Sequence, residues 1–349
     1  MHLMNSRAVS SGTVVATQCD YERDGRQFGY LDIPSSRNES AWGVIRFPVC
    51  VIRNGEGPTV LFTGGNHGDE YEGPIALQKL ARALSPEDIR GRVIILPALN
   101  YPAVRSGTRV SPIDGVNMNR AFPGKRDGTL SQLLAHYVTT VLLPMCDVVV
   151  DLHSGGKTMQ FHPFACIHKL EDEALQARSR DLLLAFGAPI SLVLEEIDNG
   201  GMLDTTVEES GKLFLAAEIG GGGTATAASV AIAERGVRNV LRHLGMLPAA
   251  SACPAAAASG RSILDTSAAG AYLHSNHEGL FEMLADLGQE VRAGDAVAQV
   301  HSLTEPDAEP VVYRSRHDGL VIGRHFPGLI KQGDFLALIA SPLKAGSGG

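Results

Sequence analysis

Two short segments of this sequence carry residue types that bind metal ions. Residues 64–70 read Gly-Gly-Asn-His-Gly-Asp-Glu and follow a short apolar run. His153 ends a second apolar run and precedes Ser-Gly-Gly. Glycines that turn a strand into a helix would place His67, Glu70 and His153 at the ends of neighbouring strands. Two histidines and one glutamate are the ligand set of a catalytic zinc, which keeps its fourth position for water.

A third apolar run ends on Glu218, which stands just before four consecutive glycines. A carboxylate that ends a buried strand is costly to bury unless it has a role. Beside a metal site, Glu218 would be the general base, with a pKa set by burial against a nearby cation. A loop whose glutamate faces water is the alternative. A phosphate loop is excluded, because no Lys-Ser/Thr pair follows the glycines.

Arg109, Asn119 and Arg120 lie in or just before a loop bounded by glycine and proline. A guanidinium group can hold a carboxylate through two hydrogen bonds, and an asparagine amide adds a donor. A solvated turn is the alternative for this loop. Asp151 stands two residues before His153 on the same predicted strand, where it could accept a hydrogen bond from the histidine ring.

The elements that must position these residues are strands that alternate with longer helices. This alternation predicts an α/β fold with a largely parallel sheet covered on both faces, and ligands in such sheets lie beyond the carboxyl ends of the strands. The expected strands are residues 41–52, 59–63, 92–96, 147–152, 190–194 and 213–219, and the expected helices are residues 74–84, 130–143, 171–186 and 224–244.

A change in composition near Leu247 predicts two domains. Residues 248–260 are rich in Ala, Pro, Ser and Gly and are typical of a linker. They would join a catalytic domain, residues 1–247, to a small all-β module, residues 261–349. Short alternating segments with glycine turns predict the strands of this module at residues 279–284, 296–300, 310–314, 319–322 and 335–339.

The β module contains two copies of one turn, Val291–Asp295 and Ile330–Asp334, which resemble turns of lipoyl- and biotinyl-type barrels. A carrier of that type needs a lysine at a hairpin tip. No lysine lies between Lys212 and Lys331, so the core of the module cannot serve as a lipoyl or biotin carrier.

Composition limits the partners of the chain. It has 349 residues, of which 44% are hydrophobic and 19% charged, and its net charge is −8. No basic run predicts binding to nucleic acid or to an anionic membrane, and no apolar run approaches the ~18 residues of a membrane span. The five scattered cysteines form no CxxC pair, and the N-terminus lacks the apolar region of a signal peptide. We therefore expect reduced thiols, a cytoplasmic protein and a small-molecule partner, and a homo-oligomer stays possible.

In their order along the chain, four motifs resemble the succinylglutamate desuccinylase/aspartoacylase family, a branch of the zinc carboxypeptidase fold. They are Gly-Gly-Asn-His-Gly-Asp-Glu, Asn-Arg-x-Phe-Pro-Gly, Asp-Leu-His-Ser-Gly and Glu-Ile-Gly, within residues 40–247. The resemblance implies a mixed sheet flanked by helices, with the β module as a smaller barrel-like part. The runs 35–42, 64–76, 111–124 and 218–228 resemble the deacetylases of ectoine breakdown, which remove acetate from N-α-acetyl-L-2,4-diaminobutyrate.

The resemblance also implies the roles of the metal ligands and of their neighbours. One zinc ion per chain would be held by His67, Glu70 and His153. The family usually writes Asp-Leu-Asn-Arg where this chain has Asn117-Met-Asn-Arg, and the Asp orients the first zinc histidine. In this chain the Asn117 amide oxygen could accept the same N–H without a charge, beside Asp151 as the second such acceptor.

The remaining site residues follow from the same resemblance. Glu218 would take a proton from water and deliver it to the leaving amine, and Arg109 would stabilise the oxyanion of the tetrahedral intermediate. The pair Asn119 and Arg120 would hold the substrate α-carboxylate. In aspartoacylase an arginine some ten residues before the catalytic glutamate holds a substrate carboxylate. The same offset here falls near Glu208 and Glu209, and this reversal of charge predicts a substrate with a side-chain ammonium.

Three alternative functions share features with this sequence. Another N-acyl amino acid deacylase, such as succinylglutamate desuccinylase or aspartoacylase, acts on a substrate that is anionic away from the scissile amide. The missing arginine before Glu218 argues against aspartoacylase. A peptide-cleaving carboxypeptidase is disfavoured because the β module would crowd the cleft. A metal-binding scaffold without activity is disfavoured because all three ligands occur together with Glu218.

Overall fold

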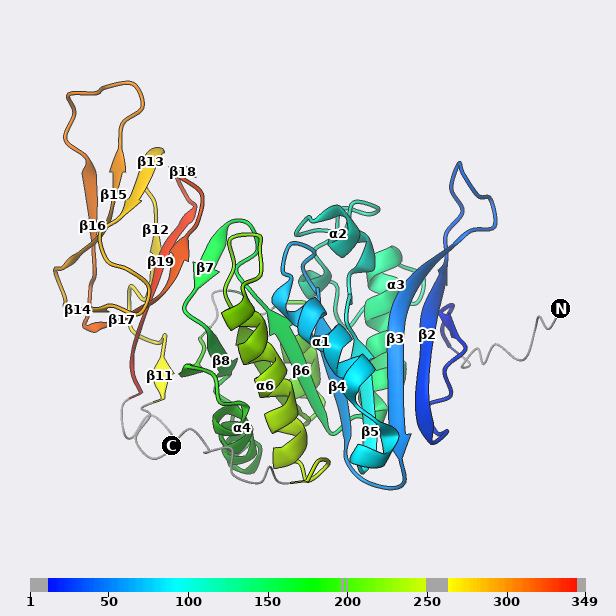
Figure 1. The fold of residues 1–349 in the computed structure, drawn as a ribbon. Helices are drawn as coiled ribbons and strands as arrows, with labels where there is room; N and C mark the ends of the chain where they lie inside the picture. Colours follow the sequence, from blue (N-terminus) through cyan, green and yellow to red (C-terminus); the bar gives the residue numbers. More distant parts are fainter. Residues whose placement is uncertain (1–11, 196–197, 199, 249–262, 344–349) are drawn as a thin grey trace.

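The computed structural model describes residues 12–195, 198, 200–248 and 263–343. Figure 1 shows a broad sheet flanked by helices and, beside it, a narrower all-β part formed by the C-terminal residues. Apart from Pro248, the predicted linker lies outside the described residues. Within the part of the chain that is described, no helix has both the length and the apolar character needed to cross a membrane.

The broad part alternates strands and helices as the sequence predicts. Its strands are β1 (Ala16–Thr17), β2 (Gly25–Pro34), β3 (Val44–Asn54), β4 (Thr59–Gly64), β5 (Gly91–Leu96), β6 (Val148–His153), β7 (Met159–Phe161), β8 (Phe164–Ile167), β9 (Ile190–Val193) and β10 (Leu213–Glu218). Its α-helices are α1 (Glu72–Ala83), α2 (Tyr101–Ser106), α3 (Leu130–Tyr137), α4 (Glu173–Phe186), α5 (Leu203–Glu209) and α6 (Ala227–His243), and π and 3₁₀ turns carry the chain on from α3 to Met145.

The sheet of the broad part is mixed. Its strand order is β1-β2-β3-β5-β4-β6-β10-β8-β9. The neighbours β5, β4, β6 and β10 are parallel, β8 and β9 are parallel, and β10 runs antiparallel to β8. The predicted α/β class with helices on the sheet is therefore confirmed, and the antiparallel strands make the sheet mixed as the family resemblance implied.

The central strands are buried on both faces, which explains why each contains a run of consecutive apolar residues. In β4, Val60 and Phe62 belong to the core shared with α1, α4 and α6, whereas Leu61 belongs to the core shared with α3 and α5. The helices therefore form a layer on each face of the sheet. This packing leaves the carboxyl ends of the parallel strands open for a site.

The ends of β4, β6 and β10 lie level with one another. Glu218 at the end of β10 is in register with His153 at the end of β6, and Gly64 at the end of β4 is in register with Leu152. The predicted placement of the three site segments at one edge of the sheet is confirmed. The reason is the parallel register, because it brings residues from distant parts of the sequence to the same level.

The C-terminal part contains only strands within the described residues. They are β11 (Leu264–Asp265), β12 (Tyr272–His274), β13 (Gly279–Met283), β14 (Glu290–Val291), β15 (Ala296–His301), β16 (Val311–Arg314), β17 (Gly319–His325), β18 (Leu329–Ile330) and β19 (Phe335–Pro342). One four-stranded sheet has the order β16-β15-β13-β18. The smaller all-β module is thus present, and we use the term β module for its described residues, 263–343.

The β module is joined to the broad sheet by hydrogen-bonded strands. β11 pairs with β9 and with β19, and β17 pairs with β7. The division of the chain into two domains at residues 248–260 therefore stays a prediction. The two predicted copies of one turn are confirmed, because the amides of Arg292 and Lys331 donate to the carboxylates of Asp295 and Asp334 at 2.8 and 2.9 Å.

Candidate active site

The loop between β4 and α1 carries His67 and Glu70 and is held tightly against its neighbours. The amide of Gly68 donates to the Thr108 carbonyl oxygen at 2.9 Å. A Cβ atom at Gly68 would lie 2.0 Å from the carbonyl carbon of Ala103, so only glycine fits this close approach. These contacts hold the loop in the conformation that turns both side chains toward the end of β6.

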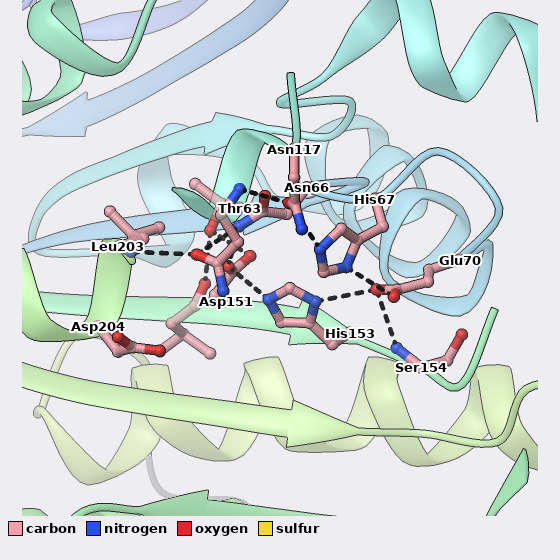
Figure 2. Close-up of polar contacts among 12 residues, drawn as sticks. Thr63, Asn66, His67, Glu70, Asn117, Asp151, His153, Ser154, Leu203 and Asp204 are labelled. Atoms are coloured by element: carbon pink, nitrogen blue, oxygen red, sulfur yellow. Dashed lines mark hydrogen bonds and ion pairs between the residues drawn. The ribbon is translucent and has the colours of Figure 1, made fainter. Parts of the chain in front are cut away.

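His67, Glu70 and His153 form one buried cluster, and Figure 2 shows both rings pointing at the Glu70 carboxylate. Glu70 Oε1 lies 2.8 Å from His67 Nδ1, and Glu70 Oε2 lies 2.9 Å from His153 Nδ1. The three potential ligand atoms lie within 4.8 Å of one another. The structure thus brings together the residues that the sequence analysis proposed as metal ligands.

The far nitrogen of each ring is held by a different acceptor. His67 Nε2 lies 3.1 Å from the Asn117 amide oxygen, and His153 Nε2 lies 2.8 Å from an Asp151 carboxylate oxygen. These contacts leave the Nδ1 atoms directed at the cluster centre. Asn117 and Asp151 therefore lie where the sequence analysis expected acceptors that orient the rings.

Two residues that sequence reasoning missed hold Asp151 in place. Thr63 Oγ1 donates to one Asp151 oxygen at 2.7 Å, and Asn66 Nδ2 donates to the other at 2.9 Å. Asn66 stands directly before His67, and Thr63 is in register with Asp151 on the neighbouring strand. The sequence signal for Asn66 was its position inside the glycine-rich motif. A buried side-chain amide in such a turn needs a hydrogen-bond partner.

The charges of the cluster are strongly coupled. Burial acts to raise the pKa of Glu70, but the neighbouring His67 and His153 charges outweigh it and hold the Glu70 pKa well below its usual value. Burial acts to lower the pKa of His153, but the Asp151 and Glu70 carboxylates raise it well above its usual value. Both directions favour charged groups, as expected where opposite charges meet in a buried site.

Glu218 is the third carboxylate of the site and lies in a different electrostatic environment. Burial raises its pKa to about 8, the Glu70 charge adds to the rise, and His153 and Arg109 oppose it. Its Oε2 atom is buried without a hydrogen-bond partner in the described structure. A carboxylate with a raised pKa and a free oxygen beside a metal-ligand cluster has the properties of a general acid–base group.

Arg109 reaches the cluster from the loop after α2. Its Nη1 atom lies 3.5 Å from Glu70 Oε1, and its side chain is 45% exposed. The structure therefore places one cation at the open side of the cluster, on a loop that the Gly68–Thr108 hydrogen bond fixes.

Asn119 and Arg120 lie on the short 3₁₀ turn Met118–Arg120, beside the start of α5. The Asn119 amide oxygen accepts hydrogen bonds from the Leu203 amide at 3.0 Å and from Asn66 at 3.3 Å. Arg120 Nε lies 3.2 Å from an Asp198 carboxylate oxygen. Asn119 thus connects the metal site to α5, and Arg120 lies at the surface beside an acidic side chain.

The structure does not bring Glu208 and Glu209 to the cluster, which corrects the expectation from their offset along the chain. Glu208 Oε2 lies 3.0 Å from His168 Nδ1, and Glu209 is exposed. His168 follows β8, which runs antiparallel to β10, so both glutamates lie toward the opposite end of β10 from Glu218. A count of residues back from Glu218 does not predict this position, because the chain passes from α5 into β10 in between. Glu208 and Glu209 lie at the end of α5, which precedes the first residues of β10, whereas Glu218 is the last residue of β10.

The donor set of the cluster fits a divalent metal. Two imidazole nitrogens and a carboxylate are typical zinc ligands, and Asp151 and Asn117 orient the rings from behind. The Glu70 carboxylate is buried against the two rings, and a cation between the ligands would take the place of their positive charge beside it.

Fold and site together define a mixed α/β protein with a His-Glu-His site that could hold a metal at the carboxyl edge of its sheet. Residues 56–244 match the succinylglutamate desuccinylase/aspartoacylase catalytic domain. The chain belongs to this family, which is zinc-carboxypeptidase-like.

Relatives of known name cover nearly the whole chain. The chain is 46% identical over 331 residues to the N-alpha-acetyl-L-2,4-diaminobutyric acid deacetylase of Halomonas elongata, which covers 95% of this chain and 96% of the relative. The fold of the present chain matches the product-bound structure of the ectoine utilization protein EutE (DoeB) from Ruegeria pomeroyi with a TM-score of 0.90 and at 50% identity. The match covers 94% of the present chain and 98% of that structure. A Silicibacter structure described as a succinylglutamate desuccinylase matches with a TM-score of 0.89, at 50% identity and with coverage of 95% and 99%.

Proposed function

We propose that this protein is a zinc-dependent amidohydrolase that removes the acetyl group from N-α-acetyl-L-2,4-diaminobutyrate, giving acetate and 2,4-diaminobutyrate. The observation that carries the proposal is the near full-length identity of 46% with a deacetylase of that name. Family membership and the position of Glu218 beside the His-Glu-His cluster support a hydrolase that acts on N-acyl amino acids. Ectoine breakdown would then be its pathway and the cytoplasm its compartment.

In the proposed mechanism His67, Glu70 and His153 hold one zinc ion per chain. When bound, the ion would supply Lewis-acid chemistry by lowering the pKa of a water molecule and polarising the acyl oxygen. The Glu218 carboxylate accepts a proton from the attacking water and delivers it to the leaving nitrogen. Arg109, at the open side of the cluster, donates hydrogen bonds to the oxyanion that develops on the acyl carbon.

The groups that bind the amino acid part of the substrate lie farther from the cluster. Arg120 would pair with the α-carboxylate, and Asn119 fixes the start of α5 beside it. One acidic residue upstream of Glu218, Asp198, lies against Arg120. We assign the side-chain ammonium of the substrate to Asp198, because one carboxylate there can face both a fixed guanidinium and a mobile ammonium.

A panel of acylated amino acids tests the substrate. Purified protein should release acetate from N-α-acetyl-L-2,4-diaminobutyrate faster than from acetylaspartate, and it should not cleave succinylglutamate. A chelator should abolish the activity and added zinc should restore it. Equal rates with acetylaspartate would leave only the family-level activity, and full activity in a sample that contains no metal would refute the mechanism.

The role of Asp198 has its own test. Asp198→Asn should lower kcat/KM for acetyl-diaminobutyrate by about tenfold, a loss suited to an exposed pair in water. N-acetyl-norvaline has a methyl group in place of the ammonium and should be affected much less. Glu208→Gln is the matched control, because Glu208 lies against His168. If both substrates lose equally on Asp198→Asn, the variant has disturbed Arg120 and the assignment is wrong.

A further inference from the structure

The loop that follows Glu218 would be highly mobile if it stood alone. It contains four consecutive glycines, all at positive φ, which is a backbone region open mainly to glycine. Glycine loses more conformational freedom on folding than any other residue. Glu218 is the last residue of β10, where it pairs with β6 and β8, so its backbone is held on one side of this loop. Its carboxylate keeps its position beside the metal-ligand cluster more firmly if other parts of the protein also hold the loop.

Strand β7 provides the hydrogen bonds that hold this loop. The Gly220 carbonyl oxygen accepts the Phe161 amide at 2.9 Å, and the Gly222 amide donates to the Met159 carbonyl oxygen at 2.9 Å. A Cβ atom at Gly221 would lie 2.3 Å from the same Met159 oxygen. The glycine loop, which begins at Gly220 just after the end of β10, is therefore hydrogen-bonded directly to β7.

β7 itself is a three-residue strand, which is too short to be stable alone. On its other side it pairs with β17 of the β module, with Phe161 opposite Gly323 and Met159 opposite His325. Figure 1 shows β7 beside the β module, at the border between the two parts. The hydrogen bonds therefore run without a break from the β module through β7 to the loop of the proposed base.

The end of β17 adds a side-chain contact to this connection. The amide of Phe326 donates to the Thr158 carbonyl oxygen at 3.0 Å. Its ring lies over Gly222, where an added Cβ atom would come within 2.7 Å of the ring Cζ. The Arg324 guanidinium lies 5.5 Å from the centre of the ring, and its Nε donates to the Gln160 side chain at 3.0 Å.

We propose that Phe326 is a positioning residue for Glu218, and that the β module takes part in catalysis by holding the glycine loop. The ring closes over Gly222, while β17 and Arg324 fix β7 beneath the loop. The proposal rests on Glu218 being the base, as set out under the proposed function. The β module, which lacks a modifiable lysine in its core, would then have the role of positioning the base.

Truncating the ring tests the proposal directly. In the metal-loaded enzyme, Phe326→Ala should lower kcat for acetyl-diaminobutyrate roughly 10- to 100-fold, since small displacements of a catalytic group have effects of this size. KM should stay within about threefold and bound metal should not change, because neither the ligands nor Arg120 is touched. Phe326→Tyr should restore kcat. Leu329→Ala removes a 58% exposed side chain of the next strand and should have no effect.

A double-mutant cycle separates positioning from general loosening. Gly222→Ala brings strain from its positive φ in any background, but its Cβ meets the ring only while Phe326 is present. We expect the loss of kcat on Gly222→Ala to be about tenfold smaller in the Phe326→Ala protein than in the wild type. Equal losses in both backgrounds would overturn the proposal.

Two further outcomes are informative. A rise in KM with unchanged kcat for Phe326→Ala would overturn the proposal by showing that the ring contacts the substrate instead. Failure of the proposed base gives a different pattern, since Glu218→Gln would then stay active whatever Phe326→Ala does. The two ideas can therefore fail separately.

Discussion

Glu218→Gln is expected to abolish activity and, in the metal-free protein, to increase stability. Folding raises the pKa of Glu218 from its ordinary 4.5 to about 8, mainly through burial. The folded state therefore favours the neutral acid. This contribution is present in full below pH 4.5 and is lost as pH rises to about 8, where the buried carboxylate ionises.

The size of the effect follows from the shift. A rise of the Glu218 pKa from 4.5 to about 8 lowers the free energy of unfolding above pH 8 by at most about 5 kcal/mol, at about 1.4 kcal/mol per pH unit. Glutamine keeps the shape without the charge. We therefore expect metal-free Glu218→Gln to unfold at higher urea than wild type near pH 8, and at nearly the same urea near pH 4.5.

The assay compares urea unfolding of chelator-treated proteins at several pH values, with kcat measured after metal is restored. Glu209→Gln is the matched control, and its effect should stay within about 0.5 kcal/mol because this side chain is exposed. The reasoning is refuted if the gain of Glu218→Gln does not grow with pH. Activity within about tenfold of wild type would refute the role of Glu218 as the base.

Three shorter predictions concern the metal site. His153→Ala should lose both bound metal, measured by elemental analysis, and activity, and metal retained at full stoichiometry would exclude His153 as a ligand. Asp151→Asn should weaken zinc binding about 10- to 100-fold in a chelator competition, and unchanged affinity would show that Asp151 does not orient the ring. Gly68→Ala should lower the melting temperature sharply, because its Cβ would lie 2.0 Å from Ala103, whereas Gly328→Ala has open space and should be neutral.

The sequence predicts the central strands well for a physical reason. β4, β5 and β6 are buried on both faces, so each contains a run of three or more consecutive apolar residues that is easy to recognise. β2 was missed because its alternation is reversed in part, with Phe28 and Tyr30 exposed and Gln27 buried. Arg46 of β3 lies over the Tyr30 ring, a contact between strands that no local pattern shows, and Arg26 lies over the Phe28 ring on the same strand.

The short elements could not be predicted because their partners define them. β7 has three residues and exists as a strand between β17 and the glycine loop, while α5 has seven residues and packs on β10. Both depend on contacts distant in the sequence. The same limit explains why the sequence offset placed Glu208 in the substrate site. An offset counted from Glu218 does not show that the chain turns between α5 and β10 and leaves Glu208 beside His168.

The sequence predicts the metal-site residues because glycines and strand ends mark them. It does not show that the two histidine rings have different hydrogen-bond acceptors. His67 Nε2 faces a neutral amide, whereas His153 lies between two carboxylates that raise its pKa well above the usual value. In the metal-free protein His153 therefore keeps its proton to higher pH than a free histidine. A coordinating imidazole nitrogen must be unprotonated, so metal uptake has to release this proton. Zinc affinity should accordingly fall as pH is lowered through the neutral range, and a calorimetric titration in buffers of different ionisation enthalpy should detect the released proton. A zinc affinity that does not change with pH, together with no released proton, would show that Asp151 and Glu70 do not hold His153 in its protonated form.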